Sequence, residues 1–219
     1  MNFAAAFRFL HALSKNNNRE WFEKRKPTYL AIKSDFEEFV AGLLTEMIKF
    51  DESLAGLNPK KLTFRIYRDV RFSKDKRPYK NNLSAGFSSR GKMVEEPGYY
   101  LHIQNGRSFI AGGMWMPNPE NLAKIRQEID YNGDKFLKIL NDRKFKKLFR
   151  SLDPDDRLKT APKGYAADHP LIDLLKNKSF IVSHTFSDKE VMDKKFLKQV
   201  AGAARTLKPL NDFLGQAIG

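Results

Sequence analysis

The sequence predicts a single α+β domain in which a central, mainly antiparallel sheet is flanked by N-terminal and C-terminal helices. Apolar residues recur at helical spacing near both ends of the chain, whereas its middle alternates with a period of two and contains a tight-turn dipeptide. Strands grouped between two sets of helices are typical of this class. No repeat and no linker composition divides the 219 residues, so we expect one domain covering residues 1–219.

Three helices are expected in the first quarter of the chain. The first covers residues 3–13, and Asn17 or Asn18 can cap a second helix that opens at Arg19. A third helix follows Pro27, a residue type favoured in the first helical turn. Its apolar stripe consists of Tyr29, Ile32, Phe36, Phe39, Leu43, Met47 and Ile48.

A strand is predicted from Leu62 to Phe72. Apolar side chains at even positions alternate there with polar ones at odd positions, which is the pattern of a strand with one buried face. On such a strand Arg65 and Arg71 project from the same face as Asp69, with alternate residues about 6.6 Å apart. Arg68 breaks the pattern because it falls on the apolar face.

Further strands are predicted at Ser84–Ser89 and in a hairpin around Asn105-Gly106, a dipeptide suited to positive φ at both central positions of a turn. This turn pairs His102 with Phe109 and Tyr100 with Ala111. One face of the hairpin then carries Tyr99, Leu101, Ile103, Ile110 and Met114, and the other carries Tyr100, His102, Gln104, Phe109 and Trp115.

The last part of the chain is expected to be helical around one more strand. Apolar stripes after Pro117 and Pro119 predict helices over residues 122–149, and a strand is predicted from Lys178 to Phe186. A long amphipathic helix closes the chain over residues 196–217, where Pro209 can kink or divide it.

Positive charge is concentrated in one segment. The formal net charge is +14, and residues 60–92 hold eleven Lys or Arg against two Asp. Such a concentration favours anionic partners, although a basic face that only contacts solvent gives the same pattern. We predict an anion-binding site for a phosphate-bearing ligand, with nucleic acid or nucleotide as the first class, formed by Arg65, Arg68, Arg71, Lys74, Lys76, Arg77 and Lys80.

Two other interpretations of the same segment stay open. One is an enzyme acting on a small phosphorylated or carboxylated substrate, in which the arginines hold the anion and His102, Asp69 or Tyr100 transfers a proton. The other is a structural or interaction protein, in which arginines and aspartates form an internal network and Arg68 pairs with a buried carboxylate. For a ligand site, the residues expected to line the pocket are Tyr67, Tyr79, Trp115, Lys163 and Tyr165.

Several classes of protein are disfavoured by the composition. The chain has no cysteine and four histidines without paired spacing, so no metal site and no disulfide is expected. Walker loops, dinucleotide-binding glycine motifs, nucleophile elbows and His-Glu-x-x-His are absent. Neither a membrane-spanning run nor a signal peptide is present, which predicts a soluble, cytoplasmic protein.

Six short sequence motifs, which we call blocks, are distributed over almost the whole chain. They are residues 16–22 (NNNREWF), 64–80 (FRIYRDVRFSKDKRPYK), 97–102 (PGYYLH), 112–115 (GGMW), 161–165 (APKGY) and 178–180 (KSF). Together these blocks resemble a widespread bacterial and fungal family of conserved hypothetical proteins, classified only as a domain of unknown function. The resemblance implies one domain and directs attention to these blocks, and it implies no activity.

Overall fold

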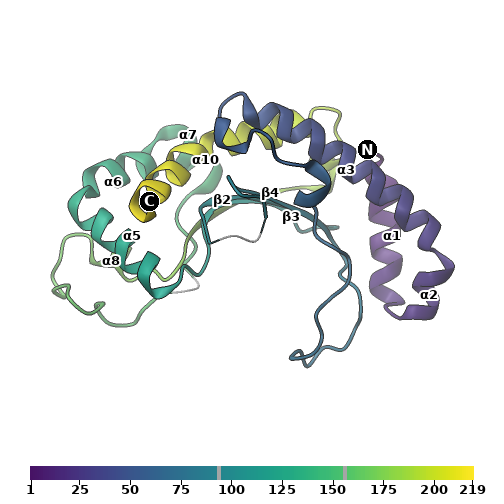
Figure 1. Ribbon diagram of the computed structural model, residues 1–219, viewed down its shortest axis with the longest axis horizontal. Coiled ribbons are helices and arrows are strands. Elements are labelled where there is room, and N and C mark those ends of the chain that lie inside the picture. Colours follow the sequence, from purple (N-terminus) through teal and green to yellow (C-terminus); the bar gives the residue numbers. More distant parts are fainter. Residues whose placement is uncertain (93–94, 155–156) are drawn as a thin grey trace.

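The computed structural model describes residues 1–92, 95–154 and 157–219 (Figure 1). Helices occupy both ends of the chain and strands its middle, so the predicted α+β class is confirmed. In chain order the elements are α1 (Phe3–Lys15), α2 (Arg19–Lys24), α3 (Lys26–Ile48), η1 (Glu52–Leu54), α4 (Pro59–Leu62), β1 (Leu83–Phe87), β2 (Gly98–Ile103), β3 (Ser108–Met114), α5 (Pro119–Tyr131), α6 (Gly133–Asn141), α7 (Arg143–Phe149), α8 (Ile172–Leu175), β4 (Phe180–Phe186), α9 (Asp188–Val191) and α10 (Phe196–Ile218).

The sheet follows the order of the chain. Its strands lie in the order β1-β2-β3-β4, and each neighbouring pair is antiparallel. The predicted pairs of His102 with Phe109 and Tyr100 with Ala111 are both present in the β2–β3 hairpin. The turn differs from the prediction in one detail, because only Gly106 takes a positive φ, of 65°, and Asn105 does not.

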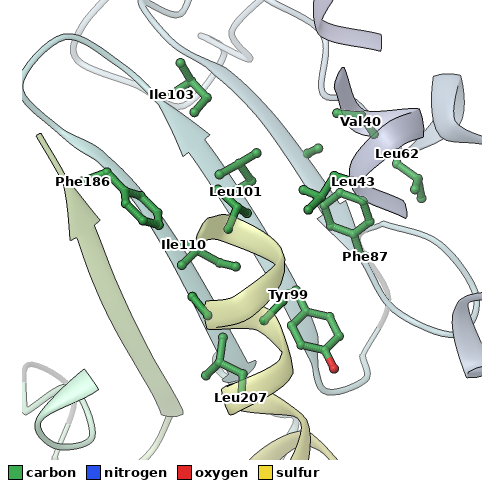
Figure 2. Close-up of a cluster of buried hydrophobic side chains, with 14 of the residues drawn as sticks. Val40, Leu43, Leu62, Phe87, Tyr99, Leu101, Ile103, Ile110, Phe186 and Leu207 are labelled. Atoms are coloured by element: carbon green, nitrogen blue, oxygen red, sulfur yellow. The ribbon is translucent and has the colours of Figure 1, made fainter. Parts of the chain in front are cut away.

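One face of the sheet packs against helices. Leu101 and Ile110 point from β2 and β3 toward Leu207 of α10, and α3 supplies Val40 and Leu43 to the same cluster (Figure 2). Gly112 allows the close approach of α10, because a Cβ atom there would lie 2.7 Å from Leu207 Cδ1. This face therefore holds the hydrophobic core of the domain.

In the ranges that the structure describes, no helix lies across the other face of the sheet. Figure 1 shows α3, α7 and α10 on one side of the sheet, while a long loop extends from the opposite side. The α1–α2 pair and the α5–α8 group extend beyond the two ends of the sheet toward that same side, so the molecule has the outline of an arch. We call the surface under this arch the open face.

The strand predicted from Leu62 to Phe72 is wrong. Leu62 ends α4, and Thr63 forms only an isolated bridge with Ala85 before the chain leaves the edge of the sheet. Leu62 and Ile66 are buried, as the alternation indicated, but Phe72 is 96% exposed. The pattern of period two reflects packing of residues 62–66 beside the core, and beyond Tyr67 the chain folds back on itself instead of joining the sheet.

Pro209 does not divide the last helix, because α10 is continuous from Phe196 to Ile218. Its buried stripe packs against β3 and α3, and this packing offsets the backbone hydrogen bond that a proline removes. Within the described ranges, no helix is both long and apolar enough to cross a bilayer.

Candidate functional site

The cationic segment forms a projecting loop, which we call the basic loop (residues 68–78). Its two ends are joined by an antiparallel bridge between Tyr67 and Tyr79. Arg68 N donates to Pro78 O at 2.9 Å, and Lys80 N donates to Ile66 O at 2.7 Å. These bonds satisfy the backbone at the base of the basic loop and leave its outer part in solvent (Figure 1).

The base of the basic loop is anchored to the N-terminal helices. Asn17 Nδ2 donates to Tyr79 O at 2.9 Å, and Asn17 Oδ1 accepts from Tyr79 N at 3.0 Å. The ring of Phe22 stacks on that of Tyr79 with centroids 4.0 Å apart, and Tyr67 lies against both rings. The sequence blocks at residues 16–22 and 64–80 therefore meet in space, which neither block indicates when considered alone.

Aspartates pair with some of the arginines inside the basic loop. Arg71 Nη2 lies 2.7 Å from Asp69 Oδ2, and side-chain and backbone hydrogen bonds from Arg71 lower the pKa of Asp69 to about 2. Asp75 accepts hydrogen bonds from Arg77 and from Arg68. These bonds, and above all the one from Arg77, lower the pKa of Asp75 below its ordinary value. Both carboxylates are therefore ionised at neutral pH and hold the loop in shape.

Arg68 belongs to this network. Its Nη1 lies 2.5 Å from Asp75 Oδ2, and its side chain is 25% exposed. The carboxylate partner expected for Arg68 is thus present, but Asp75 is only half-buried. The pair stabilises the fold of the loop locally and does not tie the loop to the core.

The remaining predicted anion-binding residues have no such partner. Among the described residues, no ion pair joins a carboxylate to Arg65, Lys74, Lys76 or Lys80, and the ammonium of Lys76 donates to the backbone oxygen of Val70. Arg65, Lys74 and Lys76 are exposed. These four cations therefore keep their charge available for a ligand.

Aromatic rings form a continuous cluster on the open face. Tyr100 lies 5.8 Å from Phe109 between ring centroids, and His102 stacks on Phe109 at 4.8 Å with an interplanar angle of 13°. Phe64, which precedes the basic loop, meets Tyr100 edge-on at 5.9 Å. All four rings are half-buried, so the cluster keeps contact with solvent.

Cations border this aromatic cluster. Lys80 Nζ and Lys92 Nζ lie 5.4 Å and 5.2 Å from the centroid of the Phe64 ring. Burial, followed by the charges of Arg65 and Lys92, lowers the pKa of Lys80, and burial lowers the pKa of Lys92. Three like charges held together in this way favour an anion beside Phe64. Phe64 and Lys92 were not among the predicted site residues, because the sequence does not indicate that both side chains lie beside Gly86 of β1.

Both ring nitrogens of His102 have polar partners. Nε2 donates to Gln104 Oε1 at 2.9 Å, and Nδ1 lies 3.2 Å from the Tyr100 hydroxyl. Burial lowers its pKa, a change that Gln104 opposes. Tyr100 and His102 are thus brought together, whereas Asp69 has its contacts with Arg71 on the basic loop. Proton transfer by these residues stays a prediction.

The predicted pocket residues do not share one place. Tyr67 and Tyr79 lie at the base of the basic loop, and Trp115 follows β3 with its side chain largely exposed. Tyr165 packs edge-on against His169, whose Nε2 lies 2.9 Å from Asp130 of α5, and Lys163 is exposed in the turn before it. Lys163 and Tyr165 therefore sit with the α5–α8 group and not with the basic loop.

Comparison with known protein families places this sequence in one of them. A match to the conserved hypothetical proteins of DUF2461 covers residues 5–213. The chain belongs to the DUF2461 family. Searches of curated proteins and of solved structures find no match. In this DUF2461 chain, no group of three or more metal-ligating side chains gathers anywhere in the ranges that the structure describes.

Proposed function

We propose that this DUF2461 protein binds single-stranded nucleic acid across the open face and the basic loop. One observation carries the proposal: cations without carboxylate partners lie beside Phe64, at the edge of a cluster of half-buried aromatic rings, on a sheet face that no helix of the described residues covers. Unpaired bases stack on aromatic side chains, and phosphates bind nearby lysines and arginines.

The division of the cations gives each part a role. Arg68, Arg71 and Arg77 form ion pairs with Asp69 and Asp75 and thereby hold the shape of the basic loop. The charges of these arginines are therefore largely neutralised within the loop. Lys74 and Lys76 extend along the loop and contact phosphates without reading sequence. Lys80 and Lys92 stand where the loop meets the aromatic cluster and hold the phosphate nearest to it.

Phe72 supports single strands over duplexes. Its side chain is 96% exposed within the basic loop, and the guanidinium of Arg71 lies 5.8 Å from its ring centroid. An exposed ring beside a cation presents one free face to an unpaired base, whereas the bases of a duplex are already stacked on each other. We therefore expect a labelled single strand to bind more tightly than the corresponding duplex.

Fluorescence anisotropy with a labelled single-stranded oligonucleotide, titrated over a series of salt concentrations, tests the proposal. The logarithm of the association constant should fall linearly with the logarithm of salt concentration, and the double variant Lys74→Ala, Lys76→Ala should reduce the magnitude of this slope by about 1.4, since each lost phosphate contact contributes about 0.7 on single strands. Tyr100→Ala should weaken binding by about 1–3 kcal/mol through lost stacking.

A matched control is available on the opposite side of the sheet. Lys144 and Lys147 of α7 are exposed, and the double variant Lys144→Ala, Lys147→Ala removes the same charge from the helix-covered side. It should leave the salt slope unchanged. Equal losses in the two double variants, or binding that does not depend on salt, would contradict a site on the open face.

A further inference from the structure

A second site is suggested by a cavity of 820 Å³ on the helix-covered side of the sheet. Its walls come from the segment after α3, from residues 88–90 and 95–97 between β1 and β2, from Tyr99 of β2 and from the C-terminal half of α10. No residue of the basic loop lines it. A cavity of this volume is large enough for a small organic molecule, and it is many times larger than the volume that one water molecule occupies.

A buried carboxylate lies in the wall of this cavity. Asp51 is 6% exposed and accepts hydrogen bonds from the Tyr99 hydroxyl at 2.8 Å and from Ser53 Oγ at 2.6 Å. Burial, and then the Asp51 charge, raises the pKa of Tyr99, so this hydroxyl keeps its proton. The cation that contacts Asp51 is Lys208, whose Nζ lies 3.9 Å from Oδ1 and is bonded more closely to Asp212.

A second buried acceptor lines the same cavity. Asn211 is 7% exposed, and its Nδ2 donates to Gly98 O at 3.2 Å. Its Oδ1 is buried and has no hydrogen-bond partner within the described parts of the chain. A buried carbonyl oxygen without a partner costs about 1–3 kcal/mol, so a donor supplied from outside the chain is favoured here.

The walls carry more carboxylates than cations. The groups that contact Asp51 are already engaged, since Tyr99 and Ser53 donate to it and Lys208 donates to Asp212. A carboxylate has about four acceptor sites, and Asp51 uses two of them for these hydroxyls. Among the described residues of the lining, the charged ones are four carboxylates, Asp51, Glu95, Glu96 and Asp212, and two cations, Arg90 and Lys208.

We infer that this cavity binds a small organic ammonium compound. Its N–H groups donate to Asn211 Oδ1 and to the free acceptor sites of Asp51, and its positive charge offsets the excess of carboxylates. A neutral polyol supplies hydrogen-bond donors but no positive charge. A carboxylate ligand supplies neither hydrogen-bond donors nor positive charge. The inference concerns a surface separate from the proposed nucleic-acid site, so either one can fail without the other.

Thermal denaturation and isothermal titration calorimetry with 1,4-diaminobutane test the inference, with 1,4-butanediol and succinate as probes of similar length. The diamine should bind saturably in the calorimeter and raise the melting temperature progressively once its concentration exceeds Kd, whereas the diol and the diacid should bind at least about tenfold more weakly. Absence of saturable diamine binding, or equal binding of the diol, would overturn the inference.

Three variants locate the binding. Asp51→Asn keeps the shape of the side chain, removes its charge and should weaken diamine binding about tenfold or more, since hydrogen bonds to charged groups contribute about 1.5–3 kcal/mol. Lys208→Met removes the ammonium that competes for these carboxylates and should tighten diamine binding. The control Glu20→Gln removes one charge from the exposed surface of α2 and should change nothing.

Lys208→Met keeps the inference testable if Asp51→Asn fails to fold. Weaker or unchanged diamine binding in Lys208→Met contradicts the inference, because the side chain would then not compete for the acceptors. Unchanged binding in a folded Asp51→Asn variant contradicts it equally. A loss in Glu20→Gln that equals the loss in Asp51→Asn would show attraction by overall charge and no specific site.

Discussion

The two faces of the sheet use the same strands for different purposes. On one face Leu101 and Ile110 pack under α10, and the polar groups nearby are buried and mostly hydrogen-bonded. On the other face Tyr100 and Phe109 stay half-exposed beside lysines that have no carboxylate partner. Successive side chains of a strand therefore serve different purposes: those under α10 stabilise the fold, and those on the open face are available for a ligand. Substitutions of neighbouring residues in β2 and β3 should accordingly affect different properties.

The largest expected effect lies on the covered face. Leu101→Ala should lower the free energy of unfolding by about 2–5 kcal/mol, because it removes a side chain that is almost fully buried and leaves a cavity. Phe109→Ala on the open face should cost only about 1 kcal/mol, since its ring is already partly in solvent. Chemical denaturation measures both, and equal losses would show that the open face is as buried as the core.

The anchor of the basic loop should give the next effect. Asn17→Ala removes both hydrogen bonds to the Tyr79 backbone and should cost about 1–3 kcal/mol. The neighbouring substitution Asn16→Ala removes one exposed bond within the end of α1 and should cost less. Thermal denaturation and the rate of proteolysis within residues 68–78 compare the two variants, and an equal cost would argue against this anchor.

Inside the basic loop, two cations should behave differently. Arg68→Ala breaks a partly exposed ion pair and should cost about 1 kcal/mol or less, whereas Lys74→Ala should leave stability unchanged. The order should reverse for oligonucleotide binding, where Lys74→Ala loses a phosphate contact. Melting temperatures and anisotropy titrations on the same two proteins separate these effects, and parallel losses would contradict the division of roles.

The smallest expected effect is the titration of His102. Its pKa is lowered from 6.5 by burial, so the folded state binds this proton less readily than the unfolded state. The contribution of His102 to stability is therefore complete above pH 6.5 and is lost progressively as the pH falls below that value. Its imidazole resonances in an NMR titration should show a midpoint below 6.5, and a midpoint above 6.5 would indicate a protonated ring with different partners.

Much of the fold could be predicted from local patterns in the sequence. The helical stripes predicted α1 to α3 and α10, Asn18 caps α2 as expected, and the hairpin pairs of His102 and Tyr100 are confirmed. These features depend on residues close together in the chain. The predicted strand Leu62–Phe72 is wrong because the hydrogen bonds of residues 66–68 go to residues 78–80, and alternation alone does not specify the partner.

The candidate site was less predictable for a related reason. The basic segment was evident from composition, but the pairing of Arg68 and Arg77 with Asp75 depends on the fold of the loop. Phe64 and Lys92 meet because Thr63 bridges Ala85 at the edge of β1, which the basic segment alone does not indicate. The cavity beside Asp51 unites segments more than 150 residues apart, as its contact with Lys208 shows, and no spacing rule joins them.

NMR chemical-shift mapping with a single-stranded oligonucleotide tests the central claim most directly. We expect the largest shifts in residues 64–80, in Lys92 and at Tyr100, His102 and Phe109, with little change in α7. Shifts concentrated in α7, or an absence of shifts on the open face at oligonucleotide concentrations that saturate other basic proteins, would show that nucleic acid does not bind the open face.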